Sequence, residues 1–233
     1  MLVPDILAPK EILLGKTLSD LKLVAEKLNL QGFVATQLAN WLYKTNIQSF
    51  DEMTNISKKV RTLLAEHYDL GVVAPVKVQE SADGTRKYLF PVSSHKFIET
   101  AFIPDEKRNT LCVSSQVGCK MGCLFCATGR QGFQAQLSAG QILNQLRSIP
   151  EWSTITNIVF MGMGEPFDNA EQVMKAQEIL TADYGFELSS RKVTVSTIGI
   201  VPAMEIFLRE SKCNLAVSLH SPFDDERRRL MPI

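Results

Sequence analysis

The chain has 233 residues, of which 45% are hydrophobic and 21% charged, and its formal net charge is zero. This is the composition of a globular protein with one sizeable core, and it excludes a fibrous or low-complexity chain. The balanced charge gives no general tendency to bind nucleic acid, and no apolar run reaches the length of a membrane span.

The N-terminus, MLVPDILAPK, lacks the charged start and the small-residue cleavage site of a signal peptide. We therefore expect a cytoplasmic protein with no membrane partner. In that compartment clustered cysteines bind metal more often than they form disulfides.

Short amphipathic helices are expected in the first seventy residues. One helix follows Ser19, its predicted N-cap, and another follows Ser57. The buried face of the first would be formed by apolar residues at helical spacing: Leu21, Val24, Ala25 and Leu28. The second helix begins with the basic stretch 58–61. Such a stretch is more often a solvated face than a phosphate contact, unless something else argues for RNA.

Residues 76–103 predict β-strands. Apolar residues alternate with polar ones on both sides of Asp83-Gly84, a typical hairpin turn. A further strand is expected at 97–103, with Glu99 inside it. Taken alone, Glu99 is more simply a solvent-facing carboxylate on a strand.

From about residue 110 strands alternate with helices. Strands are predicted at 111–114, 157–161, 192–196 and 214–219. The helices between them are predicted after Ser138, which forms a capping box with Gln141, at 170–180, and from Pro202 onward. The run at 157–161 is nearly all apolar, which is typical of a strand buried on both faces. This alternation favours a parallel α/β sheet, either open or barrel-like.

Polar and reactive residues follow each of these four strands. They comprise a cysteine loop at 119–126, the sequence GMGEP at 162–166, Ser196 with Thr197, and 218–220, which includes Ser218 and His220. In parallel α/β folds the chemistry collects at the carboxyl ends of the strands. We therefore expect these residues to share one site.

The cysteine loop holds three of the five cysteines, at Cys119, Cys123 and Cys126. An iron–sulfur cube normally takes four thiolates, so three leave one iron open to a substrate or cofactor. Structural zinc is the alternative, with Cys112 or His220 as a fourth ligand. In the GMGEP sequence the glycines would let a ligand approach the backbone, and Glu165 could receive a cationic amino group.

Taken together, these motifs resemble those of the radical S-adenosylmethionine (SAM) enzymes. Their signature is C-x3-C-x2-C with an aromatic residue, here Phe125, before the last cysteine. The closer resemblance is to the RlmN/Cfr family of radical SAM RNA adenosine methyltransferases. It is carried by TLCVSSQVGCKMGCLFCATG, FMGMGEP, VTVSTIG and AVSLHSPFDDERRRLMPI, and by the N-terminal helices with their hairpin.

The resemblance implies a role for specific residues. Cys119, Cys123 and Cys126 would ligate a [4Fe-4S] cluster, and Cys112 would be a second reactive cysteine that resolves a covalent RNA adduct. Glu99 would act as a proton acceptor. SAM contacts would be made by six residues: Gly164, Glu165, Ser196, Ser218, Leu219 and His220. Cys213 matches no family position and is interpreted as structural.

The resemblance also implies a fold and partners. We expect an α/β fold, a partial (β/α) radical SAM barrel with about four strands present, and an N-terminal helical plus β-hairpin accessory domain. Expected boundaries are 1–72 for a helical RNA-binding domain, 73–108 for a β-rich connection and 109–233 for the barrel. The implied substrates are 23S rRNA and tRNA, with a reductase or flavodoxin as electron donor and a monomeric protein.

In the family a methyl-carrying cysteine lies in a later part of the barrel. We therefore expect this chain to be an N-terminal fragment that cannot complete methylation. Three alternatives stay open. The first is methylation of carbon 8 instead of carbon 2, although Pro166 after Glu165 favours carbon 2. The others are a non-catalytic RNA-binding module with structural zinc, and a radical SAM enzyme with a non-RNA substrate.

Overall fold

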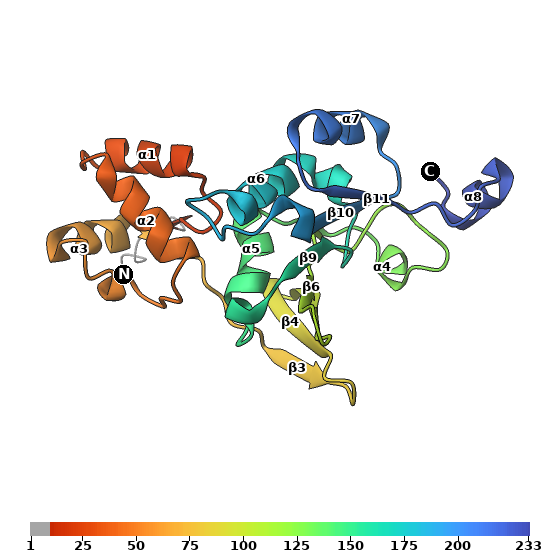
Figure 1. Cartoon of the computed structure of the whole chain (residues 1–233), viewed down its shortest axis with the longest axis horizontal. Coiled ribbons are helices and arrows are strands. Elements are labelled where there is room, and N and C mark those ends of the chain that lie inside the picture. Colours follow the sequence, from red (N-terminus) through yellow and green to blue (C-terminus); the bar gives the residue numbers. More distant parts are fainter. Residues whose placement is uncertain (1–9) are drawn as a thin grey trace, which may run out of the picture.

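The computed structural model describes residues 10–233. Residues 1–9, most of the stretch that lacks signal-peptide features, lie outside the described residues. The N-terminal helices gather at one end of the molecule, a mixed sheet occupies its centre, and α8 (Asp224–Leu230) lies at the opposite end (Figure 1). Within residues 10–233 every helix is too short or too polar to cross a membrane.

Three helices form the N-terminal region: α1 (Leu18–Lys27), α2 (Phe33–Tyr43) and α3 (Lys58–His67). The short strands β1 (Glu11–Ile12) and β2 (Tyr68–Asp69) pair in parallel and join the two ends of this region. Ser57 caps α3 as predicted. The prediction of Ser19 as the cap of α1 is wrong. Thr17 caps this helix through a capping box with Asp20, which starts α1 before Ser19.

A seven-stranded sheet carries the rest of the chain, in the order β11-β10-β9-β6-β5-β4-β3. Its strands are β3 (Lys77–Glu80), β4 (Arg86–Ser93), β5 (Lys96–Ile103), β6 (Thr110–Cys112), β9 (Asn157–Phe160), β10 (Val193–Thr197) and β11 (Asn214–Val217). The four strands from β6 to β11 are mutually parallel, as the sequence predicts, and β3, β4 and β5 join them antiparallel. The hairpin therefore extends the barrel sheet.

Helices alternate with the parallel strands: α4 (Ala127–Arg130), α5 (Ala139–Arg147), α6 (Ala170–Thr181), α7 (Val201–Glu210) and α8. The predicted capping box of Ser138 and Gln141 begins α5, and Pro202 lies in the first turn of α7. A small antiparallel pair, β7 (Gln116–Val117) with β8 (Ala135–Gln136), brackets the cysteine loop and α4.

The two faces of the parallel strands differ. One face is buried in a core that includes α5 and α6, and it is formed by alternate residues: Leu111, Ile158, Phe160, Val193 and Val195. The other face carries half-buried residues, and the register places Cys112, Val159 and Thr194 in one row across it. The prediction that β9 is buried on both faces is therefore wrong, because its alternate residues face this more open side.

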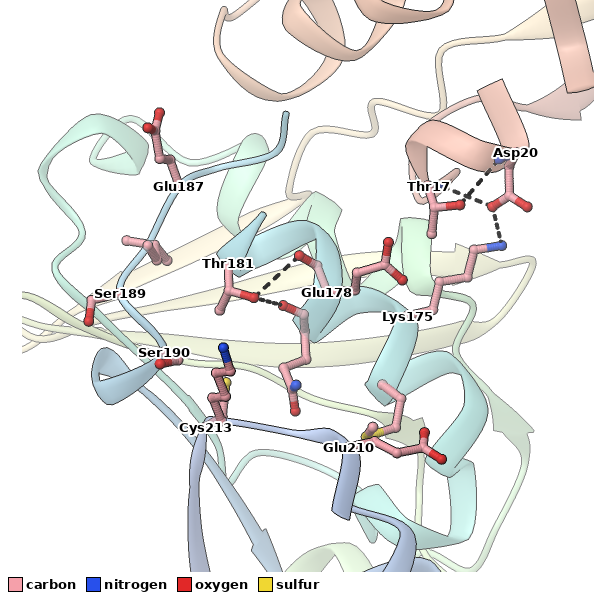
Figure 2. A pocket seen from close by; sticks show the side chains of 14 residues that line it. Thr17, Asp20, Lys175, Glu178, Thr181, Glu187, Ser189, Ser190, Glu210 and Cys213 are labelled. Atoms are coloured by element: carbon pink, nitrogen blue, oxygen red, sulfur yellow. Dashed lines mark hydrogen bonds and ion pairs between the residues drawn. The ribbon is translucent and has the colours of Figure 1, made fainter. Parts of the chain in front are cut away.

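Two contacts tie the N-terminal helices to the sheet layer. Arg147, at the end of α5, is 1% exposed and donates from Nε and Nη2 to the carbonyl oxygens of Leu42 and Ile47, both at 3.1 Å. On another side a cleft of about 900 Å³ separates α1 from α6, and the ion pair of Asp20 with Lys175 crosses it at 2.6 Å (Figure 2). The helical region is therefore packed onto the barrel.

Candidate functional site

A cavity of about 310 Å³ lies at the carboxyl ends of the parallel strands. Most of the residues predicted for the site line it: Cys119, Cys123, Cys126, Gly164, Glu165, Ser196, Ser218 and His220. These residues follow or end four different strands. They come together because parallel strands present their carboxyl ends at one edge of the sheet.

Three other predicted residues lie outside this lining. Leu219 is 55% exposed. Cys112 on β6 and Glu99 on β5 belong to the open face of the sheet. The backbone of Glu99 nevertheless contacts the GMGEP loop (162–166), because its N–H lies 3.4 Å from Sδ of Met163. Its carbonyl oxygen accepts from Oγ of Ser114 at 2.6 Å, and that Oγ accepts from the N–H of Met163 at 2.9 Å.

The cysteine loop (119–126) is held by the segment that follows β11. The backbone N–H of Leu124 donates to the carbonyl oxygen of Leu230 at 2.9 Å. The ring of Phe125 packs against the ring of His220 with 4.3 Å between centroids. His220 adopts φ +58, in the left-handed region that a non-glycine residue seldom occupies. The loop is thus fixed against a strained turn at the end of β11.

Two of the three thiols of this loop, Cys119 and Cys123, lie in an environment that opposes ionisation. Burial raises the pKa of Cys119 and Cys123, and the electrostatic influence of the neighbouring Cys126 raises both further. Thiolates are the form that binds metal, and nearby positive charge favours them. Cationic iron at this place would offset both the burial and the mutual repulsion.

Within residues 10–233 no group of three or more His, Cys, Asp or Glu side chains is close enough together to hold a metal ion. The three thiols instead share the lining of one cavity. A four-iron cluster is larger than one ion, so its thiolate ligands are spread around it. In ligand type and in position these residues fit such a cluster.

Glu165 closes the cavity from the side of the GMGEP loop and is 5% exposed. Its Oε1 accepts from Oγ1 of Thr197 at 2.6 Å and from the N–H of Phe167 at 3.0 Å, and its Oε2 accepts from the N–H of Ile198 at 2.9 Å. Burial nevertheless raises the pKa of this carboxyl. A carboxylate offers about four acceptor positions, so Oε2 retains one for a ligand.

The two glycines of the GMGEP loop let its backbone lie close to the segment 113–116. A Cβ on Gly162 would lie 2.7 Å from Oγ of Ser114, and one on Gly164, which has φ +101, would lie 2.5 Å from Cβ of Gln116. The loop can pack here only because these side chains are absent.

Sequence reasoning missed a polar network behind the cavity. Gln116 is fully buried; its Oε1 accepts from the N–H of Glu165 at 2.8 Å, and its Nε2 donates to Oδ2 of Asp168 at 2.7 Å. Asp168 also pairs with Lys120 of the cysteine loop at 2.5 Å. Gln116 lies within the quoted sequence TLCVSSQVGCKMGCLFCATG and Asp168 lies two residues after GMGEP, and these positions are the only sequence feature that could have drawn attention to them.

The remaining two predicted residues have distinct surroundings. Burial raises the pKa of the half-buried Cys112 thiol, which favours its protonated form. Glu99 is about half exposed and pairs with Lys87 across the β4–β5 ladder at 2.9 Å. All five cysteines are free thiols.

Two family profiles match separate parts of the chain. A profile of the radical SAM superfamily matches residues 113–233, just over half of the chain. A profile described as the ribosomal RNA large subunit methyltransferase N-terminal domain matches residues 12–70.

Individual relatives agree with these profiles. The chain is 54% identical over 96% of its length to a Bacteroides fragilis protein named "Probable dual-specificity RNA methyltransferase RlmN", and covers 65% of it. It is 44% identical over 95% of its length to the dual-specificity RNA methyltransferase RlmN of Halorhodospira halophila, and covers 62% of it. The chain thus spans less than two thirds of the length of these relatives.

A solved structure shares the fold as well. The crystal structure of a radical SAM methyltransferase from Sphaerobacter thermophilus superimposes with a TM-score of 0.89 at 38% identity, over 96% of this chain and 67% of that one. These matches bear out the partial radical SAM barrel and imply the cofactors expected with it, a [4Fe-4S] cluster and SAM. The chain belongs to the radical SAM superfamily and, within it, to the RlmN family of methyltransferases.

Proposed function

We propose that this protein takes part in the methylation of carbon 2 of adenosine in 23S rRNA and tRNA. One observation carries the proposal: the three thiols of the cysteine loop, Glu165 of the GMGEP loop and the polar ends of β10 and β11 line a single cavity. That donor set suits a cluster with an open iron and a cofactor that carries an amino group beside it.

In this proposal Cys119, Cys123 and Cys126 hold the cluster. When bound, the cluster and SAM supply the radical chemistry that an unactivated carbon–hydrogen bond requires. The other residues bind and orient the cofactor. The free acceptor position of Glu165 takes its amino group, Gly164 lets it approach the backbone, and four residues complete the contact: Ser196, Ser218, Leu219 and His220.

Cys112 and Glu99 would act on the RNA from the open face of the sheet. The raised pKa of Cys112 keeps a proton on its sulfur at neutral pH until a partner removes it. The Glu99 carboxylate, held by Lys87, is in a position to accept a proton. The adenine must leave its stack to reach this face. A cytoplasmic reductase or flavodoxin would supply electrons to a monomeric protein.

Carbon 2 can be distinguished from carbon 8 by nucleoside analysis. The chain is 54% identical to the Bacteroides fragilis relative and covers 65% of it, so the rest of that relative can be joined after Ile233. We expect the chimera, given SAM and a reductant, to form 2-methyladenosine in unmodified tRNA, and its Cys112→Ala variant to release no modified RNA. If mass spectrometry finds 8-methyladenosine instead, the carbon 2 assignment is wrong.

We also propose that residues 1–233 alone do not complete the reaction. The family requires a further cysteine that carries a methyl group. Outside the cysteine loop this chain has only Cys112 and Cys213, and Cys213 precedes β11, at the end of that strand away from the cavity. Detection of 2-methyladenosine with the purified chain alone would refute this.

A further inference from the structure

A further cavity lies in the N-terminal region. The helices of this region are at the end of the molecule opposite α4 and α8 (Figure 1). The volume of the cavity is about 520 Å³, and it lies among α3, β2 and the segment 48–51. We call it the N-terminal cavity. Neither the cluster nor the SAM contacts proposed above involve it, so its polar lining requires a separate explanation.

Tyr68 lines the N-terminal cavity and is 2% exposed. Its hydroxyl is buried and has no hydrogen-bond partner among residues 10–233. Lys27 Nζ lies 5.9 Å from the centre of the Tyr68 ring, which helps to fix the orientation of the side chain. A buried hydroxyl without a partner is destabilising, and natural proteins rarely retain one without a role.

Arg61 on α3 lines the same cavity and also has a buried donor without a partner among residues 10–233. Its Nη1 donates to the carbonyl oxygen of Asp51, whereas its Nε is buried without a partner in the described part of the chain. The Nε–H belongs to the edge with which arginine grips phosphate and carboxylate groups. Arg61 and Tyr68, which come from different elements, therefore each bring to the lining of one cavity a buried donor without a partner among residues 10–233.

The charges around the N-terminal cavity are mixed. Lys10 donates to the carbonyl oxygen of Ala65 at 2.5 Å, and the carboxylates of Asp51 and Asp69 also line the cavity. Oδ1 of Asp69 accepts from the N–H of Gly71 at 2.7 Å. The first turn of α3 adds Lys58 and Lys59 beside it. The lining therefore carries both signs of charge, and the lysines of α3 add positive charge one turn before Arg61.

We propose that the N-terminal cavity binds a phosphate group, supplied by the RNA backbone, through the Tyr68 hydroxyl and the Arg61 Nε–H. The inference rests on the proposed RNA substrate and specifies where the helical region would contact it. Phosphate contacts fix the register of a nucleic acid without reading its sequence. This suits a site far from the reacting base.

The test compares point variants of the full chain by fluorescence anisotropy with a labelled, unmodified tRNA transcript. Deleting the N-terminal helices would expose the apolar core that they share with the sheet, so point variants are used instead. Tyr68→Phe removes one hydroxyl that has no partner in the described chain. We expect this variant to keep or raise its melting temperature and to bind tRNA about tenfold more weakly. Arg61→Gln should also lower the slope of log K against log salt by about one, because one phosphate contact is lost.

Matched controls separate the cavity from general effects. Tyr184→Phe removes a hydroxyl that bonds Glu178 at 2.7 Å beside the cleft of Figure 2, and Arg209→Gln removes an exposed charge on α7. Both should leave tRNA affinity within about twofold of the unsubstituted chain. Weaker tRNA binding in the cavity variants alone supports the proposal.

The other outcomes are equally decisive. If the unsubstituted chain binds tRNA and Tyr68→Phe binds it equally well, the phosphate site is wrong while the RNA substrate stands. If the chain does not bind tRNA, the RNA function fails, and inorganic phosphate then tests the cavity itself. A melting temperature that phosphate raises in the unsubstituted chain but not in Tyr68→Phe assigns the site to free phosphate. If phosphate affects the melting temperatures of the two chains alike, the cavity is not a phosphate site.

Discussion

Asp168 links the two loops of the candidate site. One of its carboxylate oxygens pairs with Lys120 of the cysteine loop, and the other accepts from Gln116, which in turn accepts from the backbone of Glu165. Each of these contacts is between 2.5 and 2.8 Å. The relative position of cluster ligands and cofactor contacts therefore depends on a residue that belongs to neither motif.

We expect Asp168→Asn to loosen the cysteine loop and leave the rest of the fold in place. The amide cannot form the ion pair with Lys120, and it places a donor group near the Gln116 amide. Hydrogen exchange of 119–126 should become about tenfold faster, with unchanged exchange in β9. Asp183→Asn, an exposed carboxylate, is the control. Unchanged exchange of the loop would show that Asp168 does not hold it.

The site could be predicted from sequence where its residues are neighbours in the chain. Cys119, Cys123 and Cys126 lie within eight residues, so their spacing alone indicates a metal site. Gln116 and Asp168 are 52 residues apart, and only the packing of the GMGEP loop against β7 makes them partners. No local pattern contains that information.

The start of α1 is decided by the hydrogen bonds of Thr17 and not by the spacing of its apolar residues. Periodic apolar residues fix the buried face of α1 but not its first turn, so Ser19 was an equally good sequence candidate for the cap. The reciprocal bonds of Thr17 and Asp20, at 2.8 and 3.2 Å, decide the position. Elements with strong periodicity or a capping box, such as α5, were predicted closely.

We expect Thr17→Ala to lower the free energy of unfolding by about 1 kcal/mol, because the N–H of Asp20 loses its acceptor. Ser19→Ala should be neutral or slightly stabilising, since Ser19 is exposed within the helix and alanine has the higher helix propensity. Urea unfolding of both variants measures the difference. The reverse order of stability would mean that Ser19 is the cap after all.

Glu151 connects the segment after α5 to strand β4, and its contacts make stability depend on pH. Burial raises the pKa of its carboxyl, but hydrogen bonds from Arg86 and Tyr88 outweigh burial and hold the pKa below its usual 4.5. The folded state therefore binds fewer protons than the unfolded state. The stabilisation is present above pH 4.5 and is lost as the pH falls through the folded pKa.

Glu151→Gln should lower the free energy of unfolding at pH 7 by about 2 kcal/mol, since hydrogen bonds to a charged group are lost. Below pH 4.5 the difference from the unsubstituted chain should shrink as its carboxyl is protonated. Glu205→Gln, on the exposed part of α7, should show no such dependence. A difference that stays constant with pH would contradict the role of the ionised carboxylate.

At the scale of the whole molecule, one apolar core runs from α1 to α7. The predicted boundaries at 72 and 108 remain predictions. In the structure the strands on either side of 108 hydrogen-bond in one sheet, and Arg147 of α5 bonds to the end of α2. Arg147 and Leu42 are 105 residues apart, so sequence periodicity could not have paired them.

Arg147 provides a test of that attachment. The side chain is 1% exposed, and this burial lowers the pKa of its guanidinium to about 10. Arg147→Met should cost about 3 kcal/mol, because buried carbonyl oxygens of Leu42 and Ile47 lose their donors. Hydrogen exchange should accelerate more in 33–47 than in β9. Equal acceleration in both, or a cost no greater than that of Arg209→Met, would show that Arg147 does not join the two regions.

The most direct test of the account is oxygen-free reconstitution of the chain with iron and sulfide, followed by spectroscopy with SAM. We predict about four irons and four sulfides per chain and broad absorption at about 400 nm. The electron paramagnetic resonance spectrum of the reduced cluster should change when SAM is added, and Cys123→Ser should lose the cluster. A colourless protein with stoichiometric zinc, or a cluster whose spectrum is unaffected by SAM, would contradict the account.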